Sequence, residues 1–124
     1  PDETWECSHL GGDRFAATML LLPHGLSYGR VMPDEVAGIV DAAARGRIVP
    51  QSFRGRTAFS MPVQAAQAFA RAELGDDRLH VRLAGSEGDV VVTLRETLSE
   101  PLLSTCTATI AAPVRQFALA GIHH

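Results

Sequence analysis

The sequence predicts an α+β fold: a β-hairpin and a helix, followed by a second helix packed on an antiparallel meander. Two short apolar runs flank a connection that contains proline and glycine, two segments carry apolar residues at helical spacing, and the last third alternates apolar and polar residues. With 124 residues, 46% of them hydrophobic, the chain can form one ordinary domain or two small subdomains. We expect units at residues 1–49 and 50–124.

The hairpin is predicted by residues 17–22 and 26–31, which flank Pro23-His24-Gly25. The first run is apolar throughout, so we expect a strand that is buried on both faces of its sheet. The second run alternates. One face would carry Leu26, Tyr28 and Arg30, and the other Ser27, Gly29 and Val31.

Two helices have recognisable ends. The first should begin at Pro33, with acidic residues in its first turn, and should have Arg45 in its last turn and Gly46 just past its end. Its expected apolar stripe consists of Val36, Ile39, Val40, Ala43 and Ala44. Residues 48–59 break the pattern and are expected to form a connecting loop. The second helix should start after an N-cap at Ser60 and close at Gly75.

The remaining residues alternate as strands do. We expect strands at 78–84, at 90–94, at 102–110 and at 114–120, with a hairpin loop at 85–88. These strands would form the antiparallel meander against which the second helix packs.

Composition and charge exclude several classes of function. The net charge of −3 is too mild to indicate nucleic-acid binding, and no apolar run approaches the ~20 residues that cross a bilayer, so neither nucleic acid nor membrane is an expected partner. The acidic start is unlike a secretory signal, and two cysteines cannot make a disulfide scaffold, which favours a reduced cytoplasmic protein. Because the chain begins at Pro1 without methionine, we expect a longer parent protein.

Potential metal ligands gather near the start of the chain. Cys7, His9 and Asp13 fall within seven positions, next to Gly11-Gly12, and could converge on a metal. The spacing C-x-H-x3-D is no established zinc pattern, so purely structural roles for these side chains remain the alternative. A zinc site that adds Cys106 is a further alternative, but Cys106 lies on the apolar face of its expected strand, as an inert core thiol does.

Residues 8–16, SHLGGDRFA, and residues 22–31, LPHGLSYGRV, resemble the sucrase/ferredoxin-like family of thioredoxin-like [2Fe–2S] proteins. The resemblance is close over the first half, and the rest is similar to the C-terminal region of bacterial members. It implies that the hairpin and first helix are the C-terminal half of a thioredoxin-like domain. It also implies a cluster held by two upstream cysteines and by two histidines spaced H-x3-H. His9 matches the first histidine and Asp13 occupies the place of the second, while Gly11 and Gly12 would bend the backbone around the cofactor.

The function implied by the resemblance is electron transfer rather than catalysis, and no hydrolase or nucleotide-binding motif is present. Thiolates normally supply at least half of the cluster ligands, so we expect the [2Fe–2S] cluster in the intact parent and none in this chain alone. The alternative is a cofactor-free interaction or structural module.

All 11 basic residues are arginines, and five of them lie between residues 42 and 72 without an acidic residue. They are Arg45, Arg47, Arg54, Arg56 and Arg71. In Arg54-Gly55-Arg56 the glycine would let both guanidinium groups turn toward one carboxylate or phosphate, which suggests a patch for an acidic redox partner or a small anion. The alternative is a solvated loop whose arginines pair with distant acids. If the upstream half of the sheet is absent, the 17–31 hairpin exposes an edge, which suggests a homodimer.

Overall fold

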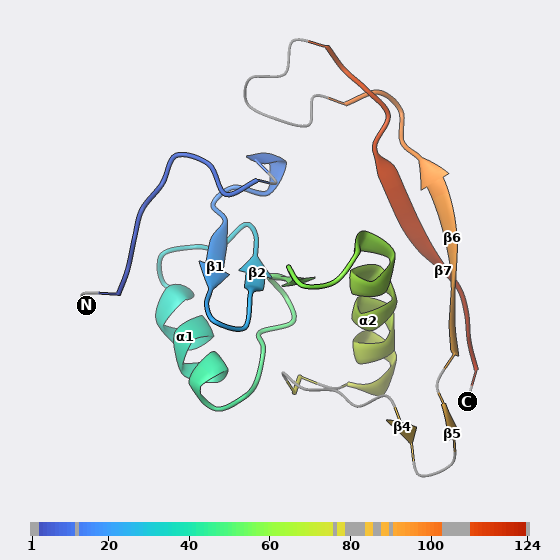
Figure 1. The fold of residues 1–124 in the computed structure, drawn as a ribbon, viewed down its shortest axis with the longest axis horizontal. Helices are drawn as coiled ribbons and strands as arrows, with labels where there is room; N and C mark the ends of the chain where they lie inside the picture. Colours follow the sequence, from blue (N-terminus) through green and yellow to red (C-terminus); the bar gives the residue numbers. More distant parts are fainter. Residues whose placement is uncertain are drawn as a thin grey trace.

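The computed structural model describes residues 3–11, 13–75, 77–78, 84–85, 88–89, 91–102 and 110–123. The elements in chain order are a 3-10 helix η1 (Asp13–Phe15), β1 (Met19–Leu21), β2 (Leu26–Tyr28), α1 (Val36–Ala44), β3 (Phe53–Arg56), α2 (Met61–Leu74), β4 (Ala84–Gly85), β5 (Gly88–Asp89), β6 (Val91–Leu98) and β7 (Arg115–His123). Figure 1 shows β1, β2 and α1 on one side of α2 and the long β6–β7 ribbon on the other. The α+β class and the expected order of its parts are confirmed.

The predicted hairpin forms, but its first strand is not buried. Strands β1 and β2 pair antiparallel, with Met19 opposite Tyr28 and Leu21 opposite Leu26. In the described sheet β1 is the outer strand of the order β1-β2-β3, and the side chains of Leu20 and Leu22 are 37% and 73% exposed. The expectation of a strand buried on both faces was wrong, because an apolar run does not reveal how many neighbours its strand will have.

Strand β3 lies where a connecting loop was expected over residues 48–59, so that expectation was wrong for its middle. It pairs with β2, with Leu26 opposite Arg56 and Ser27 opposite Gly55. Gly55 has φ +128°, and a Cβ added there would lie 2.6 Å from Oε1 of Gln64 on α2. The glycine therefore lets α2 approach the strand closely. The division of the chain near residue 50 stays a prediction.

The two helices lie where the sequence predicts them, except that α1 starts later than expected. Helix α1 begins at Val36 rather than Pro33, after a turn in which the backbone N–H of Met32 donates to Oε2 of Glu35 at 2.7 Å. Of its expected stripe only Ile39 is buried, together with Ala42, while Val40 is 49% exposed. The buried part of the stripe is narrower than expected: Ile39 belongs to the core cluster, and Ala43 packs against that cluster while only partly buried. Helix α2 matches its predicted bounds: its N-cap is Ser60, and Gly75 follows with φ +62°.

The core lies between α1 and the first sheet. Leu26, Tyr28 and Ile39 are fully buried, and Ile48 packs against them. The Tyr28 ring meets Phe53 edge-on, with centroids 5.3 Å apart, and its hydroxyl accepts a hydrogen bond from the backbone N–H of Val49 at 3.5 Å. Burial raises the pKa of Tyr28, and the Val49 hydrogen bond offsets part of that rise.

The second half is built around the β6–β7 ribbon, which contacts α2. Within β6, Val92 and Leu94 are half-buried and Thr93 is exposed, as the predicted alternation requires. Strand β7 confirms the expected strand at 114–120 and extends it. Strands β4 and β5 pair where a hairpin was expected, but Gly85 pairs with Gly88, so the expected loop at 85–88 was too long. Most of the strands expected at 78–84 and 102–110, including Cys106, falls outside the described residues. Neither described helix has the length and apolar character needed to span a bilayer.

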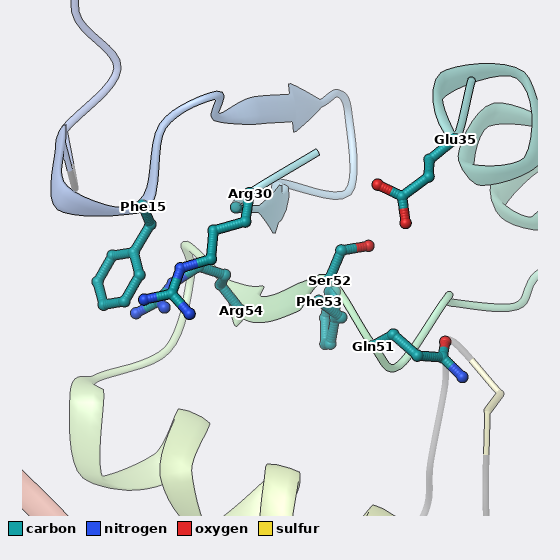
Figure 2. Close-up of a pocket in the computed structure, with 8 residues that line it drawn as sticks. Phe15, Arg30, Glu35, Gln51, Ser52, Phe53 and Arg54 are labelled. Atoms are coloured by element: carbon teal, nitrogen blue, oxygen red, sulfur yellow. The ribbon is translucent and has the colours of Figure 1, made fainter. Parts of the chain in front are cut away.

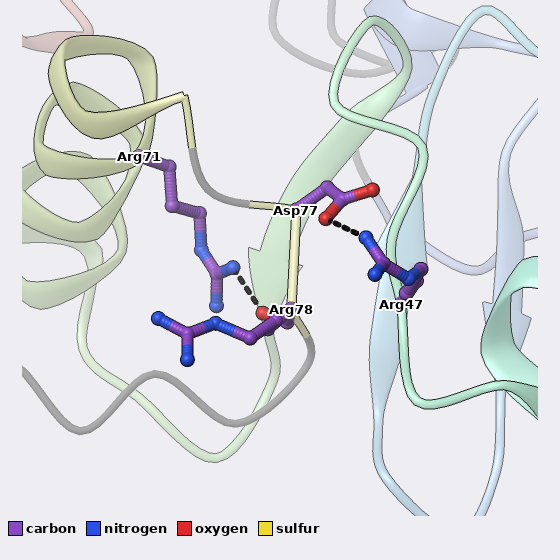
Figure 3. A network of polar contacts seen from close by, with 4 residues as sticks. All are labelled: Arg47, Arg71, Asp77 and Arg78. Atoms are coloured by element: carbon purple, nitrogen blue, oxygen red, sulfur yellow. Dashed lines mark hydrogen bonds and ion pairs between the residues drawn. The ribbon is translucent and has the colours of Figure 1, made fainter.

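Two loops far apart in sequence are fastened together after the two helices (Figure 3). Arg47 forms an ion pair with Asp77 at 2.5 Å, and the backbone N–H of Ile48 donates to the Asp77 carbonyl at 2.7 Å. Arg47 and Arg78 also form an isolated antiparallel bridge, and the side chain of Arg71, only 7% exposed, donates to the Arg78 carbonyl. We call this set of contacts, made by Arg47, Ile48, Arg71, Asp77 and Arg78, the interloop clasp.

Candidate functional site

The His9 loop, residues 3–11, is exposed and contains no helix or strand. Nδ1 of His9 lies 3.0 Å from Oγ of Ser8, and Sγ of Cys7 donates to the His9 carbonyl at 3.6 Å. Nε2 of His9 has no hydrogen-bond partner among the described residues. An imidazole held at one nitrogen with the other open is the arrangement that metal-ligating histidines use.

The glycine pair and Asp13 follow this loop. Gly11 has φ +83°, so it provides the left-handed turn that its residue type favours. Gly12 lies outside the described residues, and of Asp13 only the backbone, at the start of η1, is described. The expected roles of His9, Gly11, Gly12 and Asp13 around a cofactor therefore stay predictions.

The described side chains do not by themselves fit a [2Fe–2S] cluster. His, Cys, Asp and Glu nowhere gather in a group of three or more that could hold a metal ion within the part of the chain whose side chains are described. What the His9 loop offers is one open imidazole nitrogen and one exposed thiol, that of Cys7. The remaining ligands of any cluster would have to come from other residues.

A second feature, which the sequence did not predict, is a cluster of three arginines around one aromatic ring. The Cζ atoms of Arg54, Arg14 and Arg30 lie 3.3, 4.7 and 5.5 Å from the centroid of the Phe15 ring. We call Arg14, Arg30 and Arg54 the Phe15 arginine cluster. Guanidinium groups are attracted to aromatic faces, but like charges this close repel one another. None of the three forms an ion pair with a described carboxylate.

The backbone of the first sheet brings these side chains together. Beyond β1 and β2 the hairpin continues with hydrogen bonds from Arg30 N–H to the Phe15 carbonyl at 2.6 Å and from Val31 N–H to the Ala17 carbonyl at 3.0 Å. A Cβ at Gly29 would lie 2.7 Å from Cδ of Arg54 and 3.0 Å from Cβ of Phe15. Gly29 thus lets the Arg54 side chain cross the hairpin backbone and reach the ring.

Two observations mark this region as physically unusual. Arg30 has φ +57°, the left-handed region that a residue with a Cβ adopts at a cost. Burial lowers the pKa of Arg54, and the positive charges of Arg14 and Arg30 lower it further. Strained backbone and uncompensated charge of this kind concentrate at functional sites.

A cavity of about 200 Å³ opens beside the cluster, between the end of the hairpin and the start of α1 (Figure 2). Phe15, Arg30 and Arg54 line one side, where Figure 2 shows both guanidinium groups next to the ring. Ser52 and Glu35 line another part. The Ser52 side chain is buried, and its Oγ has no hydrogen-bond partner in the described part of the chain.

The five arginines singled out in the sequence have different surroundings. Arg45 pairs with Asp41 at 2.5 Å on α1, and Arg47 and Arg71 belong to the interloop clasp. Nε of Arg56 donates to the His24 carbonyl at 3.2 Å, and its guanidinium lies over Phe59. Only Arg54 lies in the Phe15 arginine cluster, so the structure gives Arg54 and Arg56 different neighbours. No sequence signal could have found Arg14 and Arg30, because extending the hairpin register would place Arg30 opposite Ala17 and not Phe15.

Comparison with known proteins matches the part of the chain that carries these features. A sequence model described as sucrase/ferredoxin-like matches residues 2–55. "Altered inheritance of mitochondria protein 32" of the yeast Debaryomyces hansenii is 39% identical over 54 residues, which covers 39% of this chain and 20% of that protein, so the chain spans about a fifth of the relative's length. No solved structure matches the chain. The sucrase/ferredoxin-like resemblance is confirmed for residues 2–55, and a yeast relative gives the expected bacterial origin no support.

Proposed function

We propose that this chain is part of a one-electron carrier of the sucrase/ferredoxin-like type and contributes His9 as a ligand to a [2Fe–2S] cluster. The observation that carries the proposal is that the matched segment, residues 2–55, contains a histidine whose Nδ1 is held by Ser8 and whose Nε2 is open. When bound, the cluster would supply a one-electron redox centre. Asp13 occupies the second ligand position, and Gly11 and Gly12 provide the bend around the cofactor.

The identity of the ligand gives the proposal a quantitative test. Imidazole ligation raises the reduction potential of a cluster relative to thiolate ligation and couples reduction to protonation. In the complete gene product, His9→Cys should therefore keep iron and sulfide but lower the reduction potential and weaken its pH dependence, while His9→Ala should lose iron. His123→Ala, at an exposed histidine at the end of β7, is the matched control and should change neither. A complete gene product without iron, or a His9→Cys variant with the parent's potential, would contradict the proposal.

The redox partner we propose is acidic and docks near Arg54 and Arg56. Long-range attraction between opposite charges speeds encounter and fades as salt screens it. Replacing both arginines with alanine should slow electron exchange at low ionic strength and have little effect at high ionic strength. Arg45→Ala serves as the control, since Arg45 is paired with Asp41 on α1. Equal rates for the double variant and the parent at low salt would show that Arg54 and Arg56 do not contribute to docking.

The second candidate function is a cofactor-free interaction module, favoured by the Phe15 arginine cluster and by its cavity. An iron-free gene product that still binds a protein partner through Arg54 would support it. We propose that the protein is cytoplasmic, because cysteines that form no disulfide scaffold are typical of that reducing compartment. The name of the yeast relative makes mitochondria the competing location, and cell fractionation decides between the two.

A further inference from the structure

We propose that the cavity beside Phe15 is a binding site for a phosphate-type oxyanion, either inorganic phosphate or the phosphate group of a small monoester. Arg30, Arg54 and Ser52 line the site, and Arg14 lies against the same Phe15 ring. The proposal does not depend on a cluster at His9, and the two can fail separately.

The balance of charge selects the ligand class. The three guanidinium groups lie within 5.5 Å of the Phe15 centroid and form no ion pair with a described carboxylate. Glu35 is the carboxylate that lines the cavity, and its Oε2 already accepts the Met32 N–H at 2.7 Å. Arg30 and Arg54 line the cavity and Arg14 lies against the same ring, so among the described side chains positive charge outweighs the single carboxylate of Glu35, which favours an anionic ligand. Planar guanidinium groups also match the paired oxygens of phosphate.

Ser52 is the second, independent observation. Its side chain is 9% exposed, its Oγ has no hydrogen-bond partner among the described residues, and the residue lines the cavity. Leaving a buried hydroxyl without a partner costs stability, and native proteins rarely do so without a reason. Figure 2 shows the hydroxyl on the Glu35 side of the cavity, and rotation of the Ser52 side chain would let a phosphate oxygen accept its hydrogen bond. The neighbouring backbone is fixed by the Gly29 N–H, which donates to the Ser52 carbonyl at 3.0 Å.

Size and construction agree with this assignment. A cavity of about 200 Å³ is large enough for an anion that displaces a few waters of ~30 Å³ each. Gly29 provides the space in which Arg54 crosses the hairpin, and the left-handed backbone at Arg30 directs a third charge to the same ring. Burial lowers the pKa of Arg54, and the positive charges of Arg14 and Arg30 lower it further.

The test is titration calorimetry of the chain with sodium phosphate and with phenyl phosphate at low ionic strength. Arg54→Ala should abolish measurable binding, and Arg54→Lys, which keeps the charge but loses the planar fork, should weaken it. Ser52→Ala should weaken binding about tenfold, the expected effect of losing one hydrogen bond to a charged ligand. The same substitution should leave the melting temperature of the ligand-free protein unchanged or raise it, because it removes an unpartnered buried hydroxyl. A residue that only supported the fold would not separate affinity from stability in this way.

Arg45→Ala is the matched control, since it removes one positive charge just after α1 at a residue that does not line the cavity, and it should leave the affinity unchanged. Tighter binding of phenyl phosphate than of inorganic phosphate would identify an organic monoester as the ligand, and equal binding would identify the free anion; both support the site. The proposal is overturned if neither compound binds, if Ser52→Ala leaves the affinity unchanged, or if Arg45→Ala weakens binding as much as Arg54→Ala.

Discussion

The left-handed backbone of Arg30 should make Arg30→Gly nearly neutral for stability and harmful for anion binding. At φ +57° the backbone of a residue with a Cβ is higher in free energy than that of glycine by roughly 1–2 kcal/mol. Against this, glycine loses roughly 0.5–1 kcal/mol more conformational entropy on folding. The lost contact between Arg30 and the Phe15 ring adds a cost of about 0.5 kcal/mol at an exposed site. The net change in the free energy of unfolding should therefore lie between about −0.5 and +1 kcal/mol.

Arg30→Ala is the comparison that isolates the strain. Alanine removes the guanidinium as glycine does but keeps the Cβ in the left-handed region, so it should be less stable than Arg30→Gly by about 1 kcal/mol. Urea unfolding measures this difference, and calorimetry with phosphate should show that both variants lose affinity about equally, by roughly tenfold or more. Equal stability of the two variants would refute the assignment of strain, and unchanged phosphate affinity would refute the functional reason for it.

Four further predictions concern the cofactor, assembly, core and titration. Anaerobic reconstitution of this chain alone should not give stoichiometric iron and sulfide, and metal analysis showing both would contradict that expectation. Light scattering should show a homodimer built on the β1 edge or on the C-terminal sheet. If the β1 edge forms the interface, Leu20→Glu should convert the dimer to a monomer. A parent chain that is monomeric at high concentration would contradict the dimer. Ile39→Ala should lower the free energy of unfolding by about 2–5 kcal/mol because Ile39 is fully buried, while Val40→Ala, at a 49% exposed position, should change it by less than about 1 kcal/mol in the same urea titration. Tyr28 is the only tyrosine, so tyrosinate absorbance should titrate above the usual pKa of 10.0. The raised pKa favours the neutral form in the folded state, so the free energy of unfolding should fall as the pH rises past 10.0.

Local signals in the sequence were sufficient for the hairpin and for the ends of α2. Pro23-His24-Gly25 marks a turn, and Ser60 and Gly75 mark helix ends, because each acts through its own backbone preferences. Strand β3 carries no such signal. Its sequence, Phe-Arg-Gly-Arg, has no apolar alternation, and it becomes a strand because β2 offers hydrogen bonds and α2 packs against Gly55.

The same distinction between local sequence signals and tertiary contacts applies to the candidate site. Arg54 could be singled out because it is a charge in a segment without acids, and His9 because it lies in a recognisable motif. The association of Arg54 with Arg14 and Arg30 depends on pairings between segments up to 40 residues apart, and composition does not encode these. The unpartnered hydroxyl of Ser52 is a property of packing alone, so no pattern in the sequence indicates it.

The interloop clasp has a consequence for how the protein opens. Asp77 is held to Arg47 across 30 residues of chain, and that stretch contains both β3 and α2. While the clasp holds the two ends of this stretch together, the chain between them has little conformational entropy to gain. Strand β3 or helix α2 would therefore gain little freedom by unfolding alone. Strand β3 and helix α2 should then exchange their amide hydrogens as one cooperative unit, at a rate set by release of the clasp. The exposed His9 loop lies outside this unit and can move without disturbing it, so a cofactor or partner could engage His9 while the core stays closed.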